Sequence, residues 1–368
     1  MLDEQIVQQN GAATEQSAKH RPIIIADGKC VKENFGLLRH IFFGLAAAET
    51  NAMLVVSGKV GVDLNFLQGV EIVDCPALKL PFVRKHNYTR LIERLKKFNP
   101  TVIHCFGIKM TRLARTIATD LDLPCIVSLQ DMFGCKKTIR KADGFDAIIV
   151  PGQSAADMVM QIRPRISHLV NVVPIGTFVD ESCACFDEPG RLASMILVDE
   201  LDSMKRFEPL LCALRHLAVD GYEFLMVLMG DGKARRDIVD FIRGVGLGLK
   251  INVTNEIRPL RNVLQGADVY VQLRSAGDHS PALIEAASAG LAVAACKSDM
   301  GKFLKVGQTA LFFDSADELT IYSTLQKLLD DRMLARNIAG SIQDYLRTNN
   351  TVSDMVEAMV DVYEKCKK

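Results

Sequence analysis

Short apolar runs alternate with longer amphipathic stretches along most of the chain. The runs read RPIIIAD, NAMLVVSG, PTVIHCFG and DAIIVPG in the first half, and SMILVDE, FLMVLMGDG, ADVYVQLR and LAVAACKSD in the second. Unbroken apolar runs of this length are typical of strands buried on both faces. Between them, stretches such as YTRLIERLKKF and KARRDIVDFIRGVG have helical periodicity. Strands that alternate with helices predict parallel sheets joined by right-handed crossovers.

The length of 368 residues favours two or more domains, and the pattern divides into two halves. The division falls in VVPIGTFVDESCACFDEPGR, which is rich in Pro, Gly and polar residues. We therefore predict two Rossmann-like, doubly wound α/β domains that face each other across a cleft. The predicted parts are a disordered leader (1–20), a first domain (21–175), a second domain (176–348) and a C-terminal helix that packs back on the first domain (349–368).

Composition narrows the class of protein. The ten cysteines show no framework or metal-ligand spacing, so we expect reduced, buried thiols and no metal site. The first twenty residues are polar and lack the apolar region of a signal peptide. No apolar run reaches the roughly 18 residues that span a bilayer. These features predict a soluble, cytoplasmic protein.

The formal net charge of zero conceals an asymmetry. Residues 1–176 contain 22 Lys and Arg against 16 Asp and Glu, which gives +6 and leaves −6 for the remainder. Within Lys79–Lys97, seven basic residues stand against one acidic residue. This segment indicates either peripheral contact with an anionic membrane or acceptor, or simply a solvated helix face. No aromatic stacking pattern accompanies the charge, so nucleic acid is not an expected partner.

Three segments of the second half place polar groups where strands give way to helices. In MILVDELDSMKRFEPLL, Lys205 stands at a turn-to-helix junction, where a cation can bind a diphosphate. In FLMVLMGDGKARRDI, Gly230 follows a strand and permits close approach of a ligand. In ADVYVQLRSAGDHSPALIEAASAG, a loop of small residues leads to Ser280, Pro281 and a helix that carries Glu285. A carboxylate at Glu285 could accept both hydroxyls of a ribose.

Each segment also has a plain structural interpretation. Lys205 can be a solvated helix-start lysine, the Gly-Asp-Gly turn is common between strands and helices, and Glu285 can form a structural ion pair. Other motifs are missing from the sequence: the first strand is followed by ADGKCVKENFG instead of G-x-G-x-x-G, and there is no Walker lysine, G-x-S-x-G or H-E-x-x-H. This argues against dinucleotide enzymes, P-loop enzymes and the common hydrolases.

The order and spacing of the three segments resemble the retaining family-4 GT-B glycosyltransferases. SAGDHSPALIEAASAG is similar to the family's Ser-led loop and paired-glutamate helix, and VVPIGTFVD to its interdomain Pro-Asn-Gly-Val-Asp. The resemblance covers Val170 to Asp331. It implies an N-terminal acceptor domain, a C-terminal nucleotide-sugar domain, and metal-independent glycosyl transfer in polysaccharide biosynthesis. The donor would be a nucleotide-diphosphate sugar, with no cofactor, and the acceptor a glycan, a lipid-linked molecule or a protein.

Carried over residue by residue, the resemblance assigns two sets of site residues. The donor-binding residues are Lys205, Gly230, Ile257, Ser280, Pro281 and Glu285. The catalytic residues are Gln130, Asp131 and Asp278.

The chain departs from the family pattern at several of its working positions. Glu200 stands where the family has the arginine of Gly-Arg-Leu, which contacts the donor diphosphate. Gly277 replaces the first glutamate of the pair, with Asp278 beside it, and Gln130 replaces a histidine. The glycine-rich turn after the first strand is replaced by 30–33, Cys-Val-Lys-Glu. Three hypotheses stay open: an active glycosyltransferase, a relative that keeps the fold as a binding or scaffolding module, and other GT-B chemistry such as that of a nucleotide-sugar epimerase.

Overall fold

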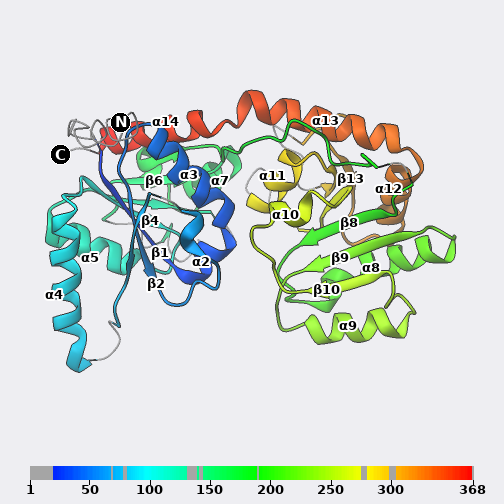
Figure 1. The fold of residues 1–368 in the computed structure, drawn as a ribbon, viewed down its shortest axis with the longest axis horizontal. Helices are drawn as coiled ribbons and strands as arrows, with labels where there is room; N and C mark the ends of the chain where they lie inside the picture. Colours follow the sequence, from blue (N-terminus) through cyan, green and yellow to red (C-terminus); the bar gives the residue numbers. More distant parts are fainter. Residues whose placement is uncertain are drawn as a thin grey trace, which may run out of the picture.

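Two parallel β-sheets, each flanked by helices, form two lobes that lie side by side (Figure 1). The structure is a computed structural model, and it describes residues 20–67, 69–77, 81–130, 139–140, 144–188, 190–274, 280–297 and 304–366. The predicted leader (1–20) therefore lies almost wholly outside the described residues. The strand order is β3-β2-β1-β4-β5-β6-β7 in the first sheet and β10-β9-β8-β11-β12-β13 in the second.

Both orders reverse direction beside the first strand of their sheet, as in doubly wound folds. The point of reversal lies between β1 and β4 in the first domain and between β8 and β11 in the second. In such sheets, ligands bind at this switch point, outside the carboxyl ends of the strands. The fold class is thus confirmed as two Rossmann-like domains.

The strands correspond to the apolar runs of the sequence. The first sheet contains β1 (Pro22–Asp27), β2 (Met53–Ser57), β3 (Glu71–Asp74), β4 (Val102–Phe106), β5 (Cys125–Ser128), β6 (Ala147–Val150) and β7 (Val170–Val172). The second contains β8 (Ala193–Val198), β9 (Phe224–Met229), β10 (Ile251–Thr254), β11 (Val269–Gln272), β12 (Ala292–Cys296) and β13 (Leu311–Phe313).

The helices follow the amphipathic stretches. The first domain has α2 (Gly28–Glu33), α3 (Phe35–Ala47), α4 (Pro81–Lys97), α5 (Thr111–Leu121) and α7 (Gln153–Ile162), with short 3₁₀ turns at Leu64–Phe66 and Pro164–Leu169. The second has α8 (Met204–Val219), α9 (Arg235–Gly244), α10 (Arg261–Leu264), α11 (Pro281–Ser288), α12 (Glu318–Asp330) and α13 (Arg332–Asn349). The chain ends in α14 (Val352–Lys365).

Side chains on each strand alternate between two apolar layers. Ile23 and Ile25 of β1 face a core shared with α4, α5 and α7, whereas Ile24 and Ala26 face the opposite layer. That second layer contains residues of α3 and α14 and continues into α10, α11 and α13 of the other domain. The two domains therefore share one continuous apolar cluster on this side.

The chain crosses between the domains twice, and hydrogen bonds join the two crossing segments. The amide of Thr177 donates to the carbonyl of Asn350 over 2.9 Å, and the Asn350 side chain donates to the carbonyl of Ile175 over 2.8 Å. From this junction α14 runs back over α3, along the top of the first domain in Figure 1. His104 of β4 joins the Tyr363 hydroxyl of α14 at 2.8 Å and the Ser128 hydroxyl at 2.7 Å.

Candidate functional site

Three turns meet at the carboxyl edge of the second sheet. They follow β9, β8 and β11, which are adjacent strands, so their ends lie side by side. The turn after β8 is 199–203, the turn after β9 contains Gly230 and Gly232, and β11 is followed by Leu273 and Arg274. The sequence assigned its donor-binding chemistry to these turns.

The Gly-Asp-Gly turn packs closely against the backbone of the turn after β8. A Cβ atom at Gly230 would lie 1.9 Å from the carbonyl oxygen of Asp199, and one at Gly232 would lie 2.2 Å from that of Leu201. The amide of Leu201 donates to the carbonyl of Asp231 over 3.0 Å. The glycines therefore permit the two turns to pack closely, which is a structural role for Gly230.

Helix α11 begins as its sequence predicts. Ser280 is the N-cap, and its hydroxyl accepts from the amide of Leu283 over 3.2 Å, while Pro281 occupies the first turn. Asp278 and Gly277 lie outside the described residues, as does Asp131.

Glu285 of α11 lies at the boundary between the domains. The residue is only 7% exposed, and a Cβ atom at Gly36 of α3 would lie 2.2 Å from its Oε1. The nearest cation is Arg258, whose Nη1 is 3.7 Å from that oxygen. Burial raises the pKa of Glu285, and the guanidinium of Arg258 opposes the rise.

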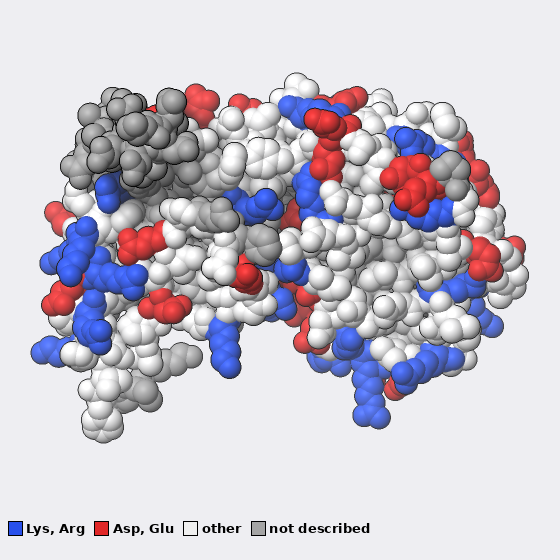
Figure 2. Space-filling view, viewed as in Figure 1, with Lys and Arg blue, Asp and Glu red and all other residues white. Residues whose placement is uncertain are grey.

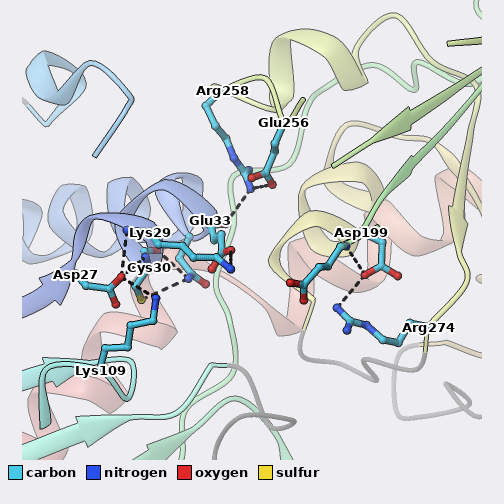
Figure 3. A network of polar contacts seen from close by, with 11 residues as sticks. Asp27, Lys29, Cys30, Glu33, Lys109, Asp199, Glu256, Arg258 and Arg274 are labelled. Carbon is cyan, nitrogen blue, oxygen red and sulfur yellow. Dashed lines mark hydrogen bonds and ion pairs between the residues drawn. The ribbon is translucent and has the colours of Figure 1, made fainter. Parts of the chain in front are cut away.

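Arg258 connects this carboxylate to the first domain. It is 4% exposed, pairs with Glu256, and donates to the carbonyl of Glu33 at the end of α2 over 2.9 Å (Figure 3). Among the described residues, Arg258 Nη1 and Glu285 Oε1 are buried without hydrogen-bond partners. Sequence reasoning did not identify Arg258.

The remaining predicted residues have varied surroundings. Lys205 is exposed at the start of α8, and among the described residues it forms no ion pair with Glu285. Ile257 is 47% exposed, and its amide approaches Met229 Sδ at 3.4 Å. Gln130 follows β5 in the first domain, and its side-chain oxygen is buried without a partner among the described residues.

The first domain presents a charged turn at its own switch point. Asp27, at the end of β1, caps α2 by accepting from the amides of Lys29 and Cys30, and it pairs with Lys109, beyond β4, at 3.3 Å (Figure 3). Lys29 pairs with Glu33 at 3.3 Å. Glu33 most strongly, and also Glu200 of the second domain, raises the pKa of Lys29. The segment 30–33 is therefore part of a helix capped by Asp27, and the charge of Glu200 in the second domain acts on its Lys29.

A further ion cluster spans the switch point of the second domain. Asp199, directly after β8, pairs with both Arg206 of α8 and Arg274, which follows β11. Sequence reasoning assigned no role to Asp199, Arg206 or Arg274.

Known proteins with the same fold carry out glycosyl transfer. Residues 187–343 match the family model described as glycosyl transferases group 1. No curated protein sequence matches the chain.

Three solved structures illustrate the similarity. Anabaena HepE, solved in complex with UDP and glucose, is 13% identical, with a TM-score of 0.75 over 94% of this chain and 99% of HepE. Sucrose-phosphate synthase from Thermosynechococcus elongatus is 16% identical, with a TM-score of 0.69 over 94% and 98%. Staphylococcus aureus TarM is 9% identical, with a TM-score of 0.72 over 94% and 99%. The fold is GT-B, and the family match supports sugar transfer as the general activity.

The described residues contain neither a metal-binding cluster nor a membrane-spanning helix. No group of three or more His, Cys, Asp or Glu residues there is arranged to hold a metal ion. Within the same ranges, none of the helices combines the length and apolar character of a membrane span.

Proposed function

We propose that the protein is a glycosyltransferase that uses a nucleotide-diphosphate sugar and transfers the sugar, with retention and without a metal, to an acceptor hydroxyl. The observation that carries the proposal is the group 1 match over 187–343, which contains Lys205, Gly230, Ser280, Pro281 and Glu285. The UDP and UDP-glucose complexes of HepE make uridine diphosphate the first donor nucleotide to test.

In the proposed reaction, the bond between the anomeric carbon and the diphosphate oxygen breaks while the acceptor oxygen bonds to the same carbon. The acceptor proton passes to the departing diphosphate. The leaving group carries negative charge, which Lys205 and the N-terminus of α11 would stabilise. Glu285 would accept hydrogen bonds from ribose hydroxyls once the nucleotide enters beside Arg258.

The test combines binding with turnover. Calorimetry with UDP, GDP, ADP and their sugars should detect one preferred nucleotide, and ligand at about 100 times Kd should raise the free energy of unfolding by roughly 2.7 kcal/mol. NMR of the product made from the preferred donor should show the donor's anomeric configuration. If no nucleotide binds at millimolar concentration, or if the configuration inverts, this proposal is wrong.

The buried position of Glu285 favours a second candidate, a GT-B protein that binds or scaffolds without catalysis. Its carboxylate packs against Gly36 and faces Arg258. Asp27 already accepts hydrogen bonds from the amides at the start of α2. A protein of this kind would fail the nucleotide screen. It would also give the same unfolding temperature with and without nucleotide sugars.

We also propose that α4 places the enzyme on an anionic membrane surface at the inner face of the membrane. Phe82, in the first turn of α4, is 100% exposed, and Val83 beside it is 40% exposed. Exposed cations follow along the helix, and Figure 2 shows Lys and Arg side chains, with Asp and Glu among them, at the left edge of the molecule, where α4 lies. The exposed cations of the helix are Arg84, Lys85, Arg90, Arg94, Lys96 and Lys97. An apolar tip beside basic residues suits insertion at the lipid headgroup level.

Co-sedimentation with vesicles tests the membrane proposal. Vesicles containing phosphatidylserine should bind the protein at low salt and lose it at high salt, because exposed charges are screened beyond roughly 10 Å in 0.1 M salt. Phe82→Ser should weaken binding, whereas Leu249→Ser, at a residue that is 97% exposed on the second domain, should not. Equal binding of both variants, or no binding to anionic vesicles, would rule the proposal out.

A further inference from the structure

The turn after β8 carries Glu200 where the family resemblance expects an arginine. Another arginine, Arg274, follows the neighbouring strand β11 at the same edge of the sheet. Glu200 occupies the expected position and is exposed. Asp199 directly precedes it, and Arg206 lies six positions after it, in α8. Charged residues therefore surround the turn after β8.

Arg206 is committed to the structure of this turn. Its guanidinium pairs with Asp199, donates to the carbonyl of Glu200 and contacts Asp202 Oδ1 at 2.6 Å. The same group lies over the Phe207 ring, 4.8 Å from its centroid, and the side chain is 19% exposed. These contacts stabilise the turn and leave a ligand little access to the Arg206 guanidinium.

Arg274 occupies a different position. It comes from the neighbouring strand end, pairs with Asp199 Oδ1 at 2.8 Å, and keeps 35% of its side chain exposed (Figure 3). Asp199 itself is 8% exposed, so its carboxylate serves as a buried anchor that two guanidinium groups share. The ion pair thus holds Arg274 across the switch point between β8 and β11, where doubly wound domains bind ligands.

The α11 N-terminus belongs to the same neighbourhood. Tyr270 of β11 is fully buried, and burial is the main reason that its pKa is raised. The Asp199 carboxylate adds to the rise, and Ser280, the N-cap of α11, opposes it. Arg274 follows β11, and Ser280 caps α11, which packs against β11. An anion bound at this edge of the sheet could therefore reach both Arg274 and the N-terminus of α11.

We propose that Arg274, anchored by Asp199, binds the diphosphate of the nucleotide donor in place of the arginine that Glu200 has replaced. This inference rests on the glycosyltransferase function proposed above. An arginine has five N–H donors in a planar fork, so it can pair with a carboxylate and contact phosphate at the same time. Glu200 and Asp202 oppose an anion here, whereas Lys205 and Arg274 favour it.

The experiment compares a nucleoside diphosphate with its monophosphate. Calorimetry first identifies which of UDP, GDP and ADP binds the wild-type protein best. Arg274→Gln should then weaken binding of that diphosphate about tenfold to hundredfold, because a charge-assisted contact is lost, and weaken the monophosphate less. Arg347→Gln is the matched control, since Arg347 is 40% exposed and pairs with Asp344 at 2.8 Å on α13.

A rescue variant separates binding from folding. Glu200→Arg added to Arg274→Gln should recover most of the lost diphosphate affinity, since it restores a guanidinium to the same edge. Thermal unfolding checks that each variant folds, and Arg274→Lys replaces Arg274→Gln if the latter does not. Wild-type protein that binds none of the three diphosphates contradicts the proposed function itself. Wild-type binding with unchanged diphosphate affinity in the Arg274 variant contradicts only the role of Arg274.

Discussion

Glu285 shows how one residue can combine a predicted binding role with a structural one. Its side chain is 9% exposed, its carboxylate lies against Gly36, and it pairs with Arg258. If it binds ribose hydroxyls, Glu285→Ala should weaken nucleotide binding by about 1–3 kcal/mol in titration calorimetry. Glu285→Gln should keep part of this affinity, because an amide oxygen can still accept one hydrogen bond.

A purely structural Glu285 would give a different result. Its removal would change the free energy of unfolding in urea and leave nucleotide affinity as it was. Glu318→Ala controls for the loss of a carboxylate, since Glu318 is 44% exposed and 3.5 Å from His216 on the second domain.

The sequence placed Glu285 on the correct helix but could not identify its neighbours. The spacing from Ser280 and Pro281 fixes the position within α11, because it depends only on local helix geometry. Gly36, which lies against the carboxylate, is 249 positions away and belongs to the other domain. Arg274 was missed for a similar reason: its partner Asp199 is brought close only by the adjacency of β8 and β11.

At the level of elements, α14 depends on a glycine in α3. A Cβ atom at Gly44 would lie 2.5 Å from Val356 Cγ2 and 2.9 Å from Val352 Cγ1. Gly44→Ala should therefore lower the free energy of unfolding, because the steric conflict with α14 exceeds the gain of about 1 kcal/mol that alanine gives inside a helix. Gly340→Ala in α13, where a Cβ would meet nothing within 4 Å, should instead raise it.

Urea denaturation of both variants measures this pair of opposite effects. Stabilisation by both substitutions would mean that α14 moves easily away from α3. Destabilisation by both would mean that steric conflict with Val356 is not the cause.

The elements were the most predictable part of the molecule. Buried parallel strands such as β1 and β12 are continuous apolar runs, and that pattern needs no knowledge of tertiary contacts. The segment that replaces the glycine-rich turn was harder to interpret. It forms α2 because Asp27 caps its amides and because Gly28 permits the carbonyl of Lys59 to approach. A Cβ atom at position 28 would lie 2.2 Å from that carbonyl oxygen.

At the scale of the whole molecule, two buried histidines lie where the C-terminal segment and the interdomain link close onto the first domain. His104 joins β4 to α14 through Tyr363, and His40 of α3 contacts the carbonyl of Gly176 at 3.3 Å. Burial lowers the pKa of His104 to about 3 and that of His40 to about 4. Both side chains are therefore neutral in the folded protein at pH 5, whereas an unfolded chain binds protons with a histidine pKa near 6.5.

This difference predicts that acid destabilises the closed arrangement. The unfolded state binds more protons than the folded state below pH 6.5, so stability is full above that pH and is lost as pH falls toward the folded-state values. Between pH 7.5 and pH 5, each histidine should reduce the free energy of unfolding by about 2 kcal/mol. Urea denaturation across this range measures the slope. In the His40→Gln, His104→Gln double variant the slope should flatten, because glutamine does not titrate yet keeps a donor and an acceptor. An unchanged slope in that variant would mean that other groups cause the acid sensitivity.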